Sequence, residues 1–220
     1  MHAYNPGILA LAAASMVLVA PPSLAADEIR VAVASNFRQA MNVVADRFED
    51  TSGHRVTLIP GSTGKHYAQI VNGAPFDIFL AADTARPYRL EEEGYAVPGT
   101  RFSYAIGRLA LYAPSWDSGG SGEEWLRTRS VEHLAIANPR TAPYGAAAIE
   151  VLKRWGLEDD YQSRIVRGEN VGQVFQFVAS GAAEAGFIAL SQAIAAGEEH
   201  HCQILPANLH RPILQQAVLL

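Results

Sequence analysis

The feature that most constrains the fold is a repeated alternation of short, β-branched apolar runs with helix-forming stretches. The runs at 29–34, 55–59 and 76–81 are followed by the helical stretches 37–49, 67–71 and 85–92. The run at 76–81 is apolar with little alternation, as expected when helices cover both faces of a parallel sheet. The pattern predicts an α/β fold built from βα units.

The second half of the chain repeats this pattern after a longer predicted strand, 104–112, and a glycine-rich loop, 116–122. The further expected elements are strand 134–137, helices 143–155 and 171–180, strand 185–189 and a return strand at 202–205. Two groups of βα units indicate two lobes, each a mostly parallel sheet flanked by helices, with a ligand cleft between them at the carboxyl ends of the strands. We expect residues 26–105 and 206–220 to form lobe 1 and residues 106–205 to form lobe 2.

The first 25 residues differ from the rest of the chain. Ile8 to Ala20 is almost continuously apolar, two prolines follow, and Ser23-Leu24-Ala25 offers small residues at a cleavage position. This order predicts a secretory signal peptide, because the apolar run is shorter than the roughly 20 residues that span a bilayer. We therefore expect an exported protein that is soluble outside the cytoplasm.

Composition excludes several other classes. The formal net charge of the 220 residues is −5 and no run of basic residues occurs, so nucleic acid is not an expected partner. Cys202 is the single cysteine, so neither a disulfide framework nor a cysteine zinc cluster holds the fold. The run 198–202, Glu-Glu-His-His-Cys, contains metal-ligand residue types. We interpret it as a solvated loop whose adjacent side chains point in different directions.

Four junctions between a strand and a helix carry small polar residues. Their key residues are Ser35 and Asn36, Ser62 and Thr63, Pro143 and Tyr144, and Asn170 and Val171. Any one of them alone is an ordinary helix cap. Because helix N-termini present unpaired N–H groups and partial positive charge, several of them meeting in one cleft can bind an anion without a cationic side chain.

The caps themselves have expected partners. Asn36 is expected to cap its helix, with Gln39 reaching back in a capping-box arrangement, and Asn170 with Gln173 repeats that spacing. Pro143 is expected at the first helical position, where proline loses no needed donor.

Two catalytic motifs are incomplete at the second junction. A P-loop ending in Gly64-Lys65 would need glycine and a hydroxyl residue at the positions of Ile59 and His66. A nucleophile elbow around Ser62 would need glycine in place of Pro60. The junctions offer donors but no carboxylate or histidine constellation, which favours binding over catalysis.

The motifs at the four junctions are Ala-Ser-Asn-Phe at 34–37, Pro-Gly-Ser-Thr-Gly-Lys at 60–65, Asn-Pro-x-x-Ala-Pro-Tyr-Gly at 138–145 and Gly-Glu-Asn-Val at 168–171. Together they resemble those of the periplasmic molybdate-binding proteins of ABC transporters. The resemblance extends from residue 27 to about residue 215, and its most specific part is 61–83.

This resemblance implies a type II periplasmic-binding-protein fold that closes on tetrahedral molybdate or tungstate and delivers it to an ABC permease in the inner membrane. It implies a monomer with neither a cofactor nor an enzymatic activity. By motif matching, the oxyanion is held, with no protein ligand on the metal itself, by Ser35, Asn36, Ser62, Thr63, Tyr144 and the N–H of Val171.

Two departures from the family pattern bear on this assignment. Ala189 stands where one branch of the family has a ligand-binding tyrosine, so Tyr144 is the candidate phenol. The family usually continues with a further strand and a terminal helix, whereas this sequence ends at Leu220, so we expect either that the sequence is a fragment or that lobe 1 is incomplete at its C-terminal end. The alternatives are a binding protein for another oxyanion such as sulfate and an exported α/β enzyme.

Overall fold

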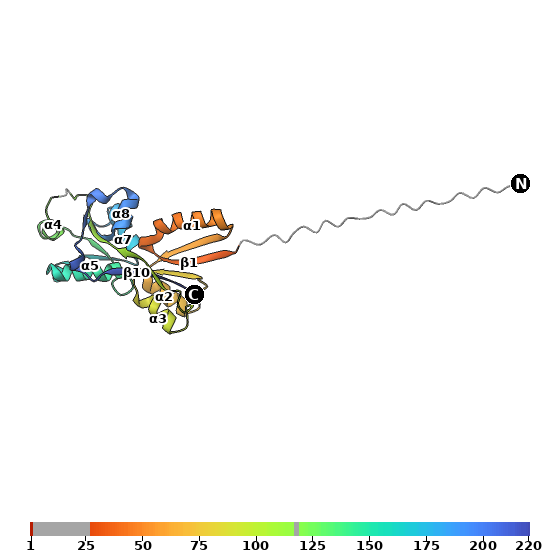
Figure 1. Cartoon of the computed structure of the whole chain (residues 1–220). Helices are drawn as coiled ribbons and strands as arrows, with labels where there is room; N and C mark the ends of the chain where they lie inside the picture. Colours follow the sequence, from red (N-terminus) through yellow and green to blue (C-terminus); the bar gives the residue numbers. More distant parts are fainter. Residues whose placement is uncertain (2–26, 117–118) are drawn as a thin grey trace.

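The computed structural model describes Met1, residues 27–116 and residues 119–220. The predicted signal peptide, apart from Met1, and two residues of the expected glycine-rich loop, Asp117 and Ser118, lie outside the described residues. The described residues form two five-stranded sheets flanked by helices (Figure 1), which confirms the predicted α/β architecture. Among them we find no helix with the length and apolar character needed to cross a bilayer.

Sheet 1 combines strands from both ends of the described chain. Its order is β2 (Arg55–Gly61), β1 (Glu28–Ala34), β3 (Ile78–Ala81), β10 (Ile213–Leu219) and β4 (Phe102–Gly107). β1 is parallel to β2 and β3, whereas β10 is antiparallel to both of its neighbours. The helices α1 (Arg38–Ser52), α2 (Thr63–Val71) and α3 (Ala85–Glu92) flank this sheet, α1 on one side and α2 and α3 on the other (Figure 1).

Sheet 2 is built in the same way from the middle of the chain. Its order is β7 (Ile165–Gly168), β6 (Leu134–Ala137), β8 (Ala185–Ala189), β5 (Leu109–Tyr112) and β9 (Cys202–Ile204). β6 is parallel to β7 and β8, and β5 is antiparallel to β8 and β9. The remaining helices are α4 (Gly122–Thr128), α5 (Pro143–Arg154), α6 (Glu158–Tyr161), α7 (Val171–Ala179) and α8 (Leu190–Ala196), with three 3-10 turns, η1 (Ser35–Phe37), η2 (Glu199–His201) and η3 (Ala207–Leu209).

The expected long strand 104–112 is two strands. β4 ends at Gly107 in sheet 1, and β5 begins at Leu109 in sheet 2, so the chain changes sheets at Arg108. Each half pairs with different neighbours, which a run of apolar residues cannot reveal. The chain returns from β9 to β10 through η3.

Other elements also differ from the expectation. α2 begins at Thr63, directly after β2, and not at residue 67. The fourth junction implies a strand before residue 168, but no range was predicted for β7, because it is a four-residue edge strand that includes the exposed Arg167. Edge strands of this length leave little hydrophobic pattern in a sequence.

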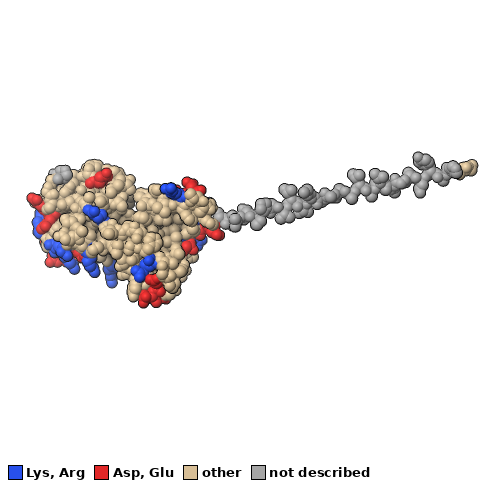
Figure 2. All heavy atoms as spheres, viewed as in Figure 1, with Lys and Arg blue, Asp and Glu red and all other residues tan. Residues whose placement is uncertain are grey.

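The hydrophobic core is largest around sheet 2. Its central side chains, including Leu111, Ile136, Leu152 and Phe187, are fully buried in one continuous cluster. Sheet 1 has a smaller cluster on each face, and an apolar groove between α1 and the β4 and β10 strands, where the side chain of Phe102 is 60% exposed. Lys and Arg side chains on the face seen in Figure 2 are spread among Asp and Glu side chains.

Candidate functional site

The four polar junctions meet at one small cavity between the two sheets, which we call the junction cavity. Its empty space, including its opening to solvent, is about 190 Å³. The residues that line it are Ala34, Ser35, Asn36, Gly61, Ser62, Thr63, Ala82, Ala142, Pro143, Tyr144, Asn170 and Val171. The structure therefore brings together all six residues predicted to hold an oxyanion.

This convergence follows from the sheet topology. β1 and β2 are parallel and end at Ala34 and Gly61, so the first two junctions lie at the same edge of sheet 1. β6 and β7 are parallel and end at Ala137 and Gly168, which places the other two junctions at one edge of sheet 2. The two edges face each other across the cavity, and four helices begin there.

The first junction differs from the prediction. Asn36 lies in η1 and makes no capping hydrogen bond, so the expected capping box with Gln39 is wrong. Its side chain is buried, and its Nδ2 donates to Gln215 Oε1 at 2.9 Å. The Oδ1 of Asn36 is buried without a partner among the described residues. Asn36 thus bonds to a residue that is distant in the sequence and does not cap its own helix. Sequence spacing cannot show such a contact.

The second junction presents two buried hydroxyl groups. Ser62 precedes α2 without a side-chain cap, and Thr63 is its first residue. Thr63 Oγ1 accepts a hydrogen bond from the N–H of Ala82 at 2.9 Å. A hydroxyl that accepts in this way keeps its own proton to donate.

The third junction places a phenol in the cavity wall. Pro143 is the first residue of α5, as predicted, and the adjacent Tyr144 is 2% exposed. Burial raises the pKa of the Tyr144 phenol far above its ordinary value, so it remains protonated. Gln215 Nε2 donates to its oxygen at 3.4 Å, which leaves the phenolic proton free for another acceptor.

The fourth junction contains the predicted cap. Asn170 accepts a hydrogen bond from the N–H of Gln173 at 3.1 Å, while Gln173 Oε1 accepts from the N–H of Glu169 at 2.7 Å. Val171 is the first residue of α7, so its N–H has no acceptor within the helix.

Gln215 is the residue that sequence reasoning missed. It is 2% exposed in β10, and it contacts Asn36, Tyr104 and Tyr144 through hydrogen bonds. In the sequence, Gln215 could be noticed only as a polar residue within the otherwise largely apolar run 213–219. Gly107 is needed beside it, because a Cβ there would collide with the Tyr144 hydroxyl and with Gln215 Nε2.

Direct contacts hold the two sides of the cavity together. The N–H of Gly64 donates to Thr141 O at 2.8 Å, and the N–H of Gly172 donates to Ser35 Oγ at 3.1 Å. At the exposed rim, Lys65 Nζ lies 3.1 Å from Glu169 Oε2. The two sheets are thus in contact around the cavity in this structure.

The lining chemistry is that of a neutral donor site. Among the described residues that line the cavity, none is a Lys, Arg, His, Cys, Asp or Glu. Hydroxyl groups and helix N-termini suit an anion, whereas proton transfer or nucleophilic attack needs a matched acid and base.

The run 198–202 is corrected by the structure. The side chains of Glu198, His200 and His201 do not diverge, since one ligand atom of each lies within 4.8 Å of the others. His66, which lies in α2, is a buried histidine. It is 2% exposed below the second junction, with Nδ1 3.1 Å from Gln69 Oε1.

The sequence from residue 29 to residue 220 matches the family described as bacterial extracellular solute-binding protein. The chain belongs to this family. The family is named for binding a solute, which agrees with a cavity whose lining offers hydrogen-bond donors and no acid–base pair.

Two curated relatives of this solute-binding protein are named molybdate-binding protein ModA. The protein from Azotobacter vinelandii is 46% identical over 197 residues, covering 89% of this chain and 78% of the relative. The protein from Rhodobacter capsulatus is 42% identical over 218 residues, covering 98% and 85%. The solved structure of the Azotobacter vinelandii periplasmic molybdate-binding protein superposes with a TM-score of 0.82 at 42% identity, covering 87% of this chain and 84% of that one.

Proposed function

We propose that this protein binds molybdate or tungstate in the junction cavity and delivers it to an ABC importer. The observation that carries the proposal is the meeting of Ser35, Asn36, Ser62, Thr63, Tyr144 and Val171 at one cavity whose described lining has no charged side chain. The names of the two ModA relatives support this ligand.

The donor set is sufficient for a tight site. Charge-assisted hydrogen bonds contribute about 1.5 to 3 kcal/mol each. Micromolar to nanomolar affinity corresponds to roughly 8 to 12 kcal/mol. Five or six such bonds reach this range after the cost of desolvation and ordering is subtracted.

We infer that the protein acts outside the cytoplasm, in the periplasm, after removal of residues 1–25 as a signal peptide. The apolar run from Ile8 to Ala20 supports export. In this proposal the protein is a monomer, and residues 26–105 with 206–220 and residues 106–205 act as two lobes that close on the anion. The closed form is then what a permease distinguishes from the open form.

Calorimetry with molybdate, tungstate, sulfate and phosphate tests the ligand. Molybdate and tungstate are expected to bind at one site with similar affinity, because both are dianionic tetrahedra of nearly equal size. Sulfate is fully ionised and is expected to bind far more weakly because it is smaller than the cavity requires. Sulfate that bound as tightly as molybdate would assign the protein to the alternative, a binding protein for another oxyanion.

Of the four anions, hydrogen phosphate best tests whether the cavity offers a hydrogen-bond acceptor. Its proton needs an acceptor, whereas backbone N–H groups offer none and the hydroxyl groups are expected to donate to the anion. Among the buried side-chain oxygens of the described lining, Asn36 Oδ1 is the one without a hydrogen-bond partner, so it is the acceptor most readily available to this proton. Rejection of phosphate means that Asn36 turns its amide nitrogen toward the anion. Phosphate binding that is lost in Asn36→Ser means that it turns its oxygen there.

A further inference from the structure

A second cluster of side chains lies at the end of sheet 2 that is remote from the junction cavity. Tyr112 pairs there with Gly186 and Cys202, whereas the opposite end of β5, at Leu109, pairs with Ala189. The turn η2 directly precedes Cys202, so it lies at the Tyr112 end. None of its residues lines the junction cavity.

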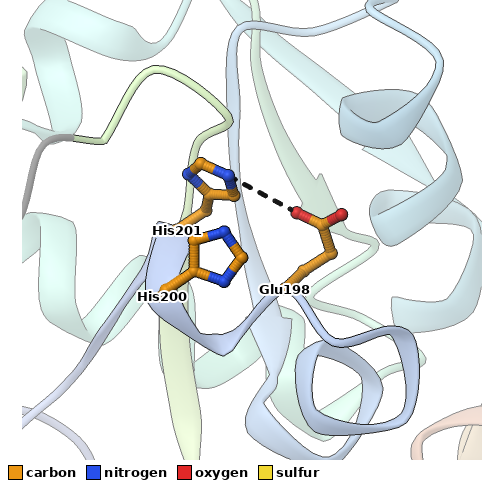
Figure 3. A group of neighbouring side chains, drawn as sticks. All are labelled: Glu198, His200 and His201. Carbon is orange, nitrogen blue, oxygen red and sulfur yellow. Dashed lines mark ion pairs between the residues drawn. The ribbon is translucent and has the colours of Figure 1, made fainter.

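We propose that Glu198, His200 and His201 form a binding site for one divalent transition-metal ion of the zinc class. Figure 3 shows the two imidazoles and the carboxylate gathered on one side of the turn. One ligand atom from each residue lies within 4.8 Å of the others, and His201 Nε2 is 3.8 Å from Glu198 Oε2. The site is independent of the proposed oxyanion function.

The geometry needs only a small adjustment to hold an ion. Ligand atoms about 2.1 Å from a tetrahedral zinc ion are about 3.4 Å from one another. The His201 and Glu198 atoms are therefore about 0.4 Å too far apart, and the widest separation, which is at most 4.8 Å, must shorten by no more than about 1.4 Å. His200 is exposed, with its ring centroid 4.0 Å from that of His201, and rotation of this exposed side chain can supply most of the movement.

The surroundings favour this arrangement. Nδ1 of His201 is buried without a partner among the described residues, which leaves Nε2, facing the carboxylate, as the ligating nitrogen. Tyr112 donates its hydroxyl proton to Glu198 Oε2 at 3.5 Å and so restrains the carboxylate. Such outer contacts commonly orient metal ligands.

The ligand types decide the class of metal. Two imidazoles and one carboxylate suit zinc, nickel or copper ions, whereas magnesium and calcium prefer oxygen ligands alone. Three protein ligands leave a fourth position for water, as in open zinc sites. Sulfur is not part of the set, because Cys202 Sγ donates to the carbonyl oxygen of Glu198.

Titration of the untagged protein with ZnCl₂ tests the proposal. One equivalent is expected to bind, and MgCl₂ at the same concentration is expected not to compete. His200→Ala and His201→Ala should each weaken zinc binding at least about 10-fold, and Glu198→Gln should do the same while keeping the side-chain shape. Titration with CoCl₂ should give visible absorption bands that these variants lose.

His133→Ala is the matched control. His133 is an exposed histidine whose Nδ1 lies 3.7 Å from Glu184 Oε2, and among the described residues no third metal-ligand residue joins this pair, so zinc affinity should be unchanged. Molybdate titration of each variant reports that it is folded. The proposal is overturned if zinc does not bind at about 100 µM, a weak limit for a three-ligand site, or if binding is unchanged in both His200→Ala and His201→Ala.

Discussion

Asn36 Nδ2 donates to Gln215 Oε1 at 2.9 Å, across 179 residues of chain and at the wall of the junction cavity. Both side chains are buried, and Gln215 also bonds to Tyr104 and Tyr144. Gln215 is therefore the residue through which the last strand of the described chain orients side chains on both sides of the cavity. It does not line the cavity itself, so its role is one of positioning.

Replacing Gln215 tests this role. Gln215→Leu removes the hydrogen bonds to Asn36 and Tyr144, and we expect a loss of about 1 to 3 kcal/mol in molybdate binding, roughly 5-fold to 150-fold in Kd. Gln216→Leu changes the adjacent residue, whose side chain bonds to Arg101 and Ser103 outside the cavity, and should leave Kd unchanged. Calorimetry that gave equal Kd values for both variants would contradict the positioning role.

Tyr144→Phe tests the phenolic donor. The variant keeps the ring but removes one charge-assisted hydrogen bond, so we expect Kd to rise roughly 10-fold to 150-fold, or about 1.5 to 3 kcal/mol. Tyr161→Phe is the control, because this buried hydroxyl bonds to Leu126 O, away from the cavity. It should lower Tm without changing Kd. An unchanged Kd for Tyr144→Phe would mean that the tyrosine contributes packing alone.

Lys65→Ala tests whether a cation is needed. The Lys65 side chain is 54% exposed and pairs with Glu169 at the rim, and such exposed pairs contribute between about 0 and 1 kcal/mol. We therefore expect Kd to change less than about 5-fold. Affinity should also vary little with ionic strength, since screening acts chiefly on exposed charges. Loss of molybdate binding in calorimetry of this variant would overturn the neutral donor site.

Closure of the two lobes can be measured by small-angle scattering. Molybdate is expected to reduce the radius of gyration, because the candidate ligands lie on both sides of the cavity. Gly64→Ala should weaken this response, since its Cβ would lie 2.9 Å from the Cα of Thr141 on the opposite side.

Gly53→Ala provides the control for this substitution. Gly53 ends α1 with a φ of +74° and has no atom near its Cβ position, so alanine there strains the backbone and lowers Tm without hindering closure. An unchanged radius of gyration in the wild-type protein, at saturating molybdate, would contradict closure.

Because the His66 side chain is buried, we expect the free energy of unfolding to decrease in acid. Burial lowers the pKa of the folded imidazole below its ordinary value of 6.5. Below about pH 6.5 the unfolded chain then binds more protons than the folded chain. The free energy of unfolding therefore decreases as the pH is lowered, until the pH reaches the pKa of the folded imidazole. The decrease in Tm between about pH 7.5 and pH 5 should be smaller in His66→Gln. His133→Gln, at an exposed site, should retain the wild-type decrease.

Much of the fold was accessible from the sequence because it rests on local patterns. Apolar runs such as 76–81 and helix signals such as Pro143 report burial and helix starts within a few residues of themselves. They predicted the α/β architecture and the four polar junctions, and motif resemblance then supplied the six candidate ligands. These remain predictions as ligands, although the structure places them at one cavity.

Tertiary structure decided what depends on contacts between distant segments. The apolar run 104–112 carries no mark of the change of sheets at Arg108, because both halves are equally suited to strands. Asn36 bonds to Gln215 and not to its own helix, and Glu198, His200 and His201 converge although they are adjacent in a polar run. Sequence patterns determine which segments form strands and helices, whereas pairing and side-chain direction are fixed only when the sheets pack.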